Sequence, residues 1–218
     1  MQIDAAREQM INQQLRAWDV LDQDVLHAFA GIAREQFVPA AYRELAYADI
    51  ELPLGRGDHM LAPKVAGRIV QAVAPRANER VLEVGTGSGY LTAALASFAH
   101  SVRSLEIRED LAAGAQKNLS EAGVRNASVV QGDAFAPEAL GHETYEVIVL
   151  AGSLPLDDPR FARQLTIGGR LFAVIGQGVL MEACLIERID AEQFRRTVLF
   201  ETSLKALVGA PQPTRFAF

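Results

Sequence analysis

The sequence predicts an α/β fold in which a mostly parallel, seven-stranded sheet ends in an antiparallel C-terminal hairpin and is preceded by N-terminal helices. After residue 79, short β-branched apolar runs alternate with helix-length segments, which is typical of a parallel sheet with helices on both faces. The last two apolar runs are separated only by Ala191, Glu192 and Gln193, so they are expected to pair antiparallel. In the first fifty residues, apolar side chains recur mainly at helical spacing.

The composition is that of one globular domain. The chain has 218 residues, 50% of them apolar, and a formal net charge of -6 from 21 basic and 27 acidic side chains. This balance gives no general attraction to nucleic acid or to an anionic membrane. The single cysteine, Cys184, excludes an internal disulfide framework, and no signal pattern or bilayer-spanning run is found. We therefore expect a cytoplasmic protein with no nucleic-acid or membrane partner.

The N-terminal part, residues 1–78, is expected to be a helical segment packed on a core of residues 79–218, the two forming a single domain. Asp22 is expected to cap a helix that begins just after it. Pro63 suits the first turn of another helix. Between these helices, residues 37–57 are rich in proline and glycine, so we expect a loop there. The helical apolar residues before this loop are Met10, Ile11, Leu15, Trp18, Val25, Leu26, Phe29 and Ile32.

The strands of the sheet are predicted from their β-branched apolar runs. The five parallel strands are expected at residues 81–84, 102–106, 128–131, 147–150 and 170–175. Residues 109–122 form the clearest helix between them. The antiparallel hairpin is expected to consist of residues 184–190 and 195–204.

A glycine-rich turn follows the first of these strands, with the pattern E-x-G-x-G-x-G from Glu83 to Gly89. The dinucleotide fingerprint G-x-G-x-x-G does not fit, because Tyr90 stands where its third glycine belongs. The Gly-Lys-Ser/Thr of a phosphate-binding loop is absent. Glycines at a strand end let the backbone approach a ligand closely, and the following helix N-terminus favours a carboxylate as well as a phosphate. The turn therefore indicates an adenosine-bearing ligand that also carries a carboxylate.

Two further acids end the next two predicted strands. Glu106 lies about 20 residues beyond the glycine turn, where an acid accepts hydrogen bonds from ribose hydroxyls. Asp133 ends the third strand, where a carboxylate can accept a hydrogen bond from an adenine amino group. Ligands of such sheets bind at the carboxyl ends of the strands, so the glycine turn and both acids are expected to form one site.

This order of motifs resembles that of S-adenosylmethionine-dependent methyltransferases with a Rossmann-like core. Residues 32–39, 46–49 and 52–55 are similar to the run PRE-x-FVP … AY-x-D … LPIG of the protein-L-isoaspartate O-methyltransferase family. The glycine motif VLEVGTGSGYLTAALA (81–96) and residues 164–171 are also very similar to that family. The resemblance runs from about Met10 to Arg170 and is weak beyond it.

The resemblance implies a class I, Rossmann-like methyltransferase that uses S-adenosylmethionine to methylate the carboxylate of isoaspartyl residues in damaged peptides and proteins. It also implies that the cofactor is bound by the glycine motif and the next two strand ends. The expected cofactor-binding residues are Glu83, Gly85, Thr86, Gly87, Gly89, Tyr90, Glu106, Asp133 and Ala134.

The loop after residues 52–55 departs from the family's T-I-S-x-P-H motif, whose serine is assigned to substrate and cofactor contact. The threonine is replaced by His59, the serine by Leu61 and the histidine by Lys64. Leucine has no hydroxyl donor, so the catalytic residue is unknown, and these three residues are expected to bind the substrate. A methyltransferase with a different acceptor and a non-catalytic cofactor-binding homologue remain alternatives. No metal-ligand spacing is found, so no metal site is expected.

Overall fold

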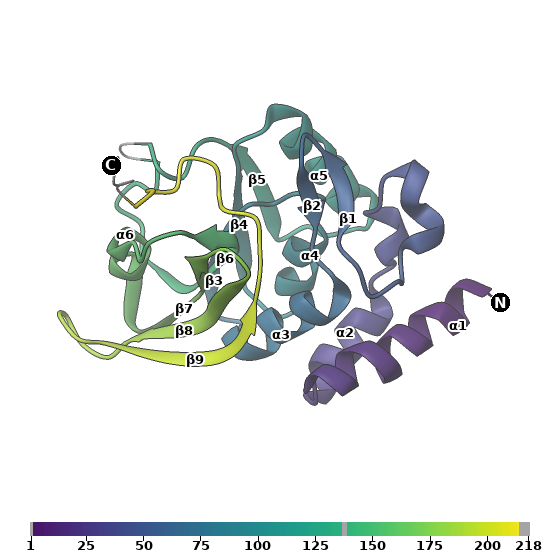
Figure 1. Ribbon diagram of the computed structural model, residues 1–218, viewed down its shortest axis with the longest axis horizontal. Coiled ribbons are helices and arrows are strands. Elements are labelled where there is room, and N and C mark those ends of the chain that lie inside the picture. Colours follow the sequence, from purple (N-terminus) through teal and green to yellow (C-terminus); the bar gives the residue numbers. More distant parts are fainter. Residues whose placement is uncertain (1, 137–138, 214–218) are drawn as a thin grey trace.

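The computed structural model describes residues 2–136 and 139–213, and its main feature is a seven-stranded sheet in the order β5-β4-β3-β6-β7-β8-β9 (Figure 1). The first five strands in this order run parallel, β8 is antiparallel to β7, and β9 is antiparallel to β8. This confirms the predicted sheet and its C-terminal hairpin. The strands are β3 (Arg80–Val84), β4 (Ser101–Glu106), β5 (Ala127–Gln131), β6 (Tyr145–Leu154), β7 (Leu165–Gln177), β8 (Leu180–Arg188) and β9 (Phe194–Thr202).

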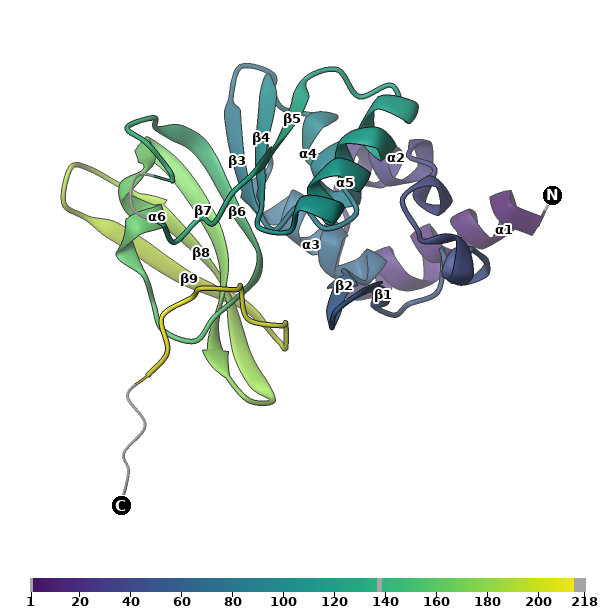
Figure 2. The same cartoon turned by 90° about the horizontal axis from the view of Figure 1, so that it is seen from above.

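Helices lie on both sides of this sheet, with α3, α4 and α5 on one side and α6 on the other (Figure 2). The α-helices are α1 (Gln2–Gln9), α2 (Gln23–Gly31), α3 (Pro63–Val73), α4 (Tyr90–Ala96), α5 (Glu109–Glu121) and α6 (Pro159–Arg163). A π-helical turn, η1 (Met10–Leu15), and three 3-10 turns, η2 (Arg16–Trp18), η3 (Arg34–Gln36) and η4 (Ala40–Leu45), complete the set. Over the described residues, no helix combines the length and apolar character that a membrane span requires.

Two predicted helix starts are confirmed. Asp22 Oδ1 accepts hydrogen bonds from the backbone of Asp24 at 2.9 Å and of Val25 at 3.1 Å, so it caps α2. Pro63 is the first residue of α3, where the missing N–H costs nothing.

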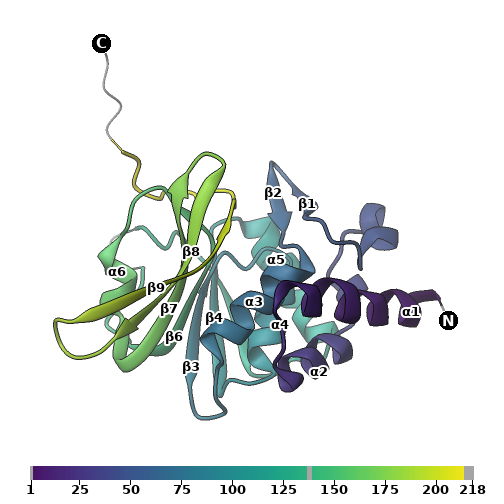
Figure 3. The same cartoon turned by 60° about the horizontal axis from the view of Figure 1, so that its bottom comes forward.

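The two faces of the sheet contribute to separate apolar clusters, because neighbouring strand residues point to opposite faces. In β3, Val81 belongs to one cluster and Leu82 to the other; in β6, Val147 and Ile148 are divided in the same way. The cluster that contains Val81 also contains Phe29 of α2, so the N-terminal helices share a core with the sheet. Figure 3 shows α1 and α2 beside α3 and α4.

The expected loop over residues 37–57 is wrong in part, since it holds η4 and the first strand of a small antiparallel sheet, β1 (Leu52–Gly55) paired with β2 (Asp58–Met60). The N-terminal segment is therefore not wholly helical. Arg56 and Gly57 connect the strands with φ of 50° and 75°. Positive φ at both central residues is the requirement of the type I′ turn, which commonly joins the strands of a hairpin, so the glycines mark a hairpin rather than irregular chain.

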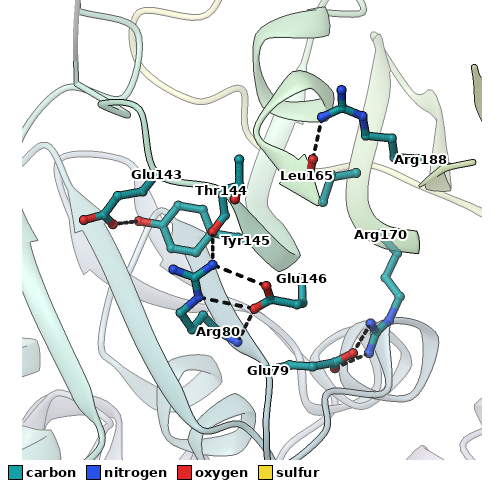
Figure 4. A network of polar contacts seen from close by, with 9 residues as sticks. All are labelled: Glu79, Arg80, Glu143, Thr144, Tyr145, Glu146, Leu165, Arg170 and Arg188. Atoms are coloured by element: carbon teal, nitrogen blue, oxygen red, sulfur yellow. Dashed lines mark hydrogen bonds and ion pairs between the residues drawn. The ribbon is translucent and has the colours of Figure 1, made fainter. Parts of the chain in front are cut away.

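Ion pairs hold the amino ends of the central strands (Figure 4). Arg170 donates to both carboxylate oxygens of Glu79, at 2.9 and 2.8 Å. The backbone N–H of Arg80 donates to Glu146 at 2.8 Å, and the Arg80 side chain donates to the Thr144 carbonyl at 2.6 Å. These contacts fix the starts of β3 and β6 and leave the opposite, carboxyl ends of the strands available for a site.

After β9 the chain returns across the carboxyl end of β6, in a stretch that we call the C-terminal segment (residues 203–210; Figure 1). The backbone N–H of Ser153 donates to Lys205 O at 2.9 Å, and Leu207 N–H donates to Ser153 O at 3.0 Å. The hydroxyl of Ser153 also donates to Leu204 O at 2.8 Å. This segment is thereby attached at the edge of the sheet where the glycine turn lies.

Candidate functional site

The main cavity opens at the carboxyl ends of β3 and β4. Its walls come from the β1–β2 hairpin, the glycine turn, the ends of β4, β5 and β6, the start of α5 and the C-terminal segment. The residues that line it include Leu54, Asp58, His59, Gly85, Gly87, Glu106, Ile107, Arg108, Asp133, Ala134, Lys205 and Leu207. The glycine turn and the two acids that end successive strands are thus brought together, as the sequence predicts.

The backbone of the glycine turn strongly favours glycine at three positions. Gly85, Gly87 and Gly89 have φ of 94°, 56° and 86°, values that side chains of L-residues rarely allow. A Cβ on Gly87 would also lie 3.2 Å from the Leu54 side chain of the hairpin. The turn therefore combines a left-handed backbone with close approach of neighbouring chain, which keeps the cavity floor free of side-chain atoms.

Glu106 is held in place by the backbone on both of its oxygens. Oε2 accepts from Gly87 N–H at 2.8 Å and Oε1 from Arg108 N–H at 3.0 Å. An ionised carboxylate has about four acceptor positions, so two remain for a ligand that carries hydroxyl groups. The side chain is almost fully buried yet borders the cavity.

Asp133 is fixed in a similar way after β5. Its Oδ1 accepts from Phe135 N–H at 2.8 Å. A Cβ on Gly209 of the C-terminal segment would lie 3.2 Å from the same oxygen, so the segment passes directly over this acid. Ala134 lies beside it in the cavity wall.

Glu83, expected among the cofactor-binding residues, lines neither the main cavity nor the hollow described below. It is 0% exposed, and its Oε2 accepts from Thr92 at 2.5 Å and Ser104 at 2.7 Å. Ser104 in turn shares a 2.5 Å hydrogen bond with Thr86 of the glycine turn. Burial raises the pKa of Glu83 to about 7, although the hydrogen bonds from Ser104 and Thr92 oppose this. Glu83 thus supports the glycine turn from beneath.

A second, smaller hollow adjoins the main cavity and shares His59, Gly85, Gly87 and Ala151 with it. Its other walls are mostly apolar and come from the end of β2 and the loop after it, the start of α3, the glycine turn and α4. They are formed by Met60, Leu61, Ala66, Thr86, Ser88, Tyr90 and Leu91.

The three residues expected to face a substrate are placed differently from one another. His59 is exposed and borders both hollows, and Leu61 lines the second hollow. Lys64 lines neither. Its Nζ donates to Asp49 at 2.8 Å and lies 4.2 Å from the centre of the Trp18 ring. Lys64, which is expected to bind the substrate, is therefore not brought to this hollow, because Asp49 and the Trp18 ring hold its ammonium group elsewhere.

Sequence reasoning missed an ion cluster at the mouth of the main cavity. Asp58 accepts from Lys205 Nζ at 2.6 Å and also forms an ion pair with Arg108. Burial alone would raise the pKa of Asp58, but these two cations outweigh it and lower the pKa. Because the three residues lie 50 to 147 positions apart, no spacing in the sequence relates them.

Arg34 was also missed as a site residue, although it lies in the run that resembles PRE-x-FVP. It is 0% exposed. Its Nε donates to Ala46 O and its Nη2 to Leu61 O, both at 2.7 Å, and its guanidinium lies 4.5 Å from the centre of the Tyr90 ring. It therefore connects the substrate loop at Leu61 to α4. The quoted sequence run was the only available signal.

Comparisons with known proteins identify relatives over almost the whole chain. The model of the family described as protein-L-isoaspartate(D-aspartate) O-methyltransferase (PCMT) matches residues 5–209. Protein-L-isoaspartate O-methyltransferase 2 of Pelobacter propionicus is 36% identical over 94% of this chain and 91% of its own. Protein-L-isoaspartate O-methyltransferase of Koribacter versatilis is 37% identical over 93% and 90%.

One solved structure extends the comparison to the fold. It is a Plasmodium falciparum chain, named as a candidate protein-L-isoaspartate O-methyltransferase and solved in complex with S-adenosyl-L-homocysteine. It superposes with a TM-score of 0.79 over 92% of this chain and 97% of its own, at 18% sequence identity. This likeness confirms the expected methyltransferase fold.

Proposed function

The chain belongs to the protein-L-isoaspartate(D-aspartate) O-methyltransferase family, and from this we propose that it transfers a methyl group from S-adenosylmethionine to the carboxylate of isoaspartyl residues in damaged proteins. One observation carries the proposal beyond family membership. The main cavity and the second hollow share the backbone of the glycine turn and His59, so a donor in one and an acceptor in the other would meet there.

The main cavity fits S-adenosylmethionine in its donor set. Glu106 has acceptor capacity for two ribose hydroxyls, and Asp133 Oδ2 is an acceptor for the adenine amino group. Of the residues expected to bind the cofactor, Gly85, Gly87 and Ala134 line this cavity, and Thr86 and Tyr90 line the adjoining second hollow. Gly89 lines neither and lies against α5, where a Cβ would be 3.3 Å from Ala115 O. Glu83 would support the turn from beneath. Bound there, the cofactor would supply an electrophilic methyl group on a positively charged sulfur.

The methyl acceptor proposed for the second hollow is a carboxylate, which needs no general base. A carboxylate is already an anion near pH 7, so the task of this chain is to place one of its oxygens in line with the methyl group. We assign that task to His59 and the loop at Leu61, which border the shared wall. Lys64 would contribute indirectly, by its ion pair with Asp49 beside the loop.

The setting of the reaction is part of the same proposal. The partner would be an isoaspartyl-containing peptide or protein, and the location the cytoplasm. The single cysteine, Cys184, is a free, buried thiol, which fits a reducing compartment.

The direct test is methyl transfer from labelled S-adenosylmethionine to an isoaspartyl peptide, with the same peptide containing normal aspartate as the control. We expect base-labile label on the isoaspartyl peptide only. Cofactor binding with no transfer to the isoaspartyl peptide would refute the proposed acceptor. That result would favour the alternative that the apolar wall at Leu61 suggests, a different methyl acceptor on the same scaffold.

A further inference from the structure

A buried cation without a carboxylate partner lies behind the second hollow. Arg34 is fully buried, and its hydrogen bonds go to two carbonyl oxygens, Ala46 O and Leu61 O. Among the described residues no carboxylate forms an ion pair with it, and its Nη1 has no hydrogen-bond partner. The neighbouring Glu35 is directed instead to Arg7 and Tyr47.

The other cations near the site each contact a carboxylate, although the single charge of Asp58 balances only one of its two partners. Lys64 is paired with Asp49, and Arg108 and Lys205 share Asp58. Burial lowers the pKa of the Arg34 guanidinium, but arginine remains charged in proteins. Burying a charge with no counter-charge is costly, and that cost is offset when an anion binds nearby.

We infer that Arg34 is the positioning residue that makes the second hollow select an anionic acceptor. This rests on the proposed function. The guanidinium holds Leu61 O at 2.7 Å on one side of the hollow and lies over the Tyr90 ring, which forms another wall. The guanidinium itself is fully buried, and the electrostatic effect of a buried charge is stronger than that of an exposed one.

The adjoining start of α3 strengthens the same potential. A planar trans peptide directs its C=O and N–H to opposite sides. Because Arg34 donates a hydrogen bond to Leu61 O, the N–H of the same peptide, which belongs to Ala62, points away from the guanidinium. Ala62 is the N-cap of α3 and provides no side-chain cap. The uncapped N-terminus of an 11-residue helix favours negative charge, so both features favour a carboxylate beside Leu61.

The test compares an acid with its neutral counterpart. One peptide carries the isoaspartyl carboxylate and the other a carboxamide in its place, used as a competitive inhibitor. In Arg34→Met we expect KM for the acid to rise about tenfold or more, as for loss of an interaction with a charged group, while the Ki of the carboxamide and the Kd of S-adenosylhomocysteine change little. Arg34→Lys, which keeps the charge, should recover part of the preference.

Arg68→Met is the matched control. Arg68 also lies over an aromatic ring, 4.6 Å from the centre of Phe200, but it bonds to Trp18 O and Asp19 away from the hollow. Arg68→Met should leave the KM of the acid peptide and the Ki of the carboxamide peptide unchanged. Equal losses for acid and carboxamide in Arg34→Met would show a merely structural role and overturn the inference. If Arg34→Met weakens only the binding of S-adenosylhomocysteine, the charge of Arg34 acts on the cofactor's carboxylate instead. That result would also overturn the inference.

A measurement on the unaltered chain covers the case in which the Arg34 variants do not fold. The preference for the acid over the carboxamide should persist from about 0.05 to about 0.5 M salt, because a buried charge is screened much less than an exposed one. A preference that disappears with salt would point to exposed His59 and overturn the inference. Absence of any methylation of the isoaspartyl peptide would refute the proposed function itself, which is a different result.

Discussion

The carboxylate of Glu106 accepts a hydrogen bond from the backbone N–H of Gly87 at 2.8 Å, which joins the end of β4 to the glycine turn after β3. Its other oxygen accepts from Arg108 N–H. The two strands are neighbours in the sheet, so the contact joins two separate sequence motifs into one rigid wall. An acid held in this way needs no rearrangement before it binds a ligand, which favours affinity.

The first prediction concerns this acid. Glu106→Ala should weaken binding of S-adenosylhomocysteine about ten- to a hundredfold, or roughly 1.5–3 kcal/mol, because hydrogen bonds to a charged acceptor are lost. Titration calorimetry measures the change. Glu109→Ala, at an exposed position in the first turn of α5, is the control and should bind as the unaltered chain does. An unchanged affinity in folded Glu106→Ala would mean that the ribose is bound elsewhere.

The second prediction concerns Leu61, which occupies the position of the family's serine. Leu61→Ser restores a hydroxyl donor beside the second hollow, so methylation of an isoaspartyl peptide should become about tenfold faster, the effect of one hydrogen bond to a charged group. Steady-state rates with labelled S-adenosylmethionine test this. A chain whose acceptor has changed would show no gain on the isoaspartyl peptide, and its own reaction would lose apolar contact worth roughly 1–3 kcal/mol.

The site elements that follow local sequence rules could be predicted. The glycine turn, Glu106 and Asp133 each stand at the end of a β-branched run, and parallel strands bring their carboxyl ends to one edge. The hairpin of β8 and β9 could be predicted because the three residues between the runs leave no room for a crossover helix.

The parts of the site that depend on contacts between residues far apart in the sequence could not be predicted. Glu83 looks like a ligand in the motif, yet its neighbours Thr92 and Ser104 enclose it. The C-terminal segment carries no motif, and only the hydrogen bonds at Ser153 bring it to the cavity. Such contacts are set by tertiary packing, which local patterns do not encode.

The third prediction follows from the buried carboxyl of Glu83, whose pKa is raised from 4.5 to about 7. The stability that the protonated form contributes is fully present below about 4.5 and is lost as the pH rises through about 7. Glu83→Gln removes this loss. Relative to the unaltered chain, the free energy of unfolding of the variant should therefore gain up to roughly 3 kcal/mol between pH 5 and pH 8.

Urea unfolding at the two pH values tests the prediction for Glu83. Glu109→Gln, at an exposed site, should show the same pH dependence as the unaltered chain. If Glu83→Gln also follows the unaltered chain at both pH values, Glu83 is ionised throughout and its burial is compensated by a charge.

The attachment of the C-terminal segment depends on one glycine in β6. A Cβ on Gly152 would lie 2.8 Å from Leu207 Cδ2 and 3.0 Å from Lys205 O. The second atom belongs to the backbone, so a side-chain rotation cannot relieve the contact. Leu207 and Lys205 both line the main cavity, and Lys205 also forms the ion pair with Asp58 at its mouth.

The fourth prediction is that Gly152→Ala displaces the C-terminal segment and weakens binding of S-adenosylhomocysteine about tenfold or more, since overpacking a close contact costs roughly 1–3 kcal/mol. Limited proteolysis should cleave the variant within residues 203–210 faster than the unaltered chain, and added S-adenosylhomocysteine should slow that cleavage. Gly114→Ala is the matched control, because a Cβ there meets no atom within 4 Å and the helix α5 favours alanine. It should bind normally and be slightly more stable. Normal binding together with rapid cleavage in Gly152→Ala would show that the segment does not contribute to the cofactor site.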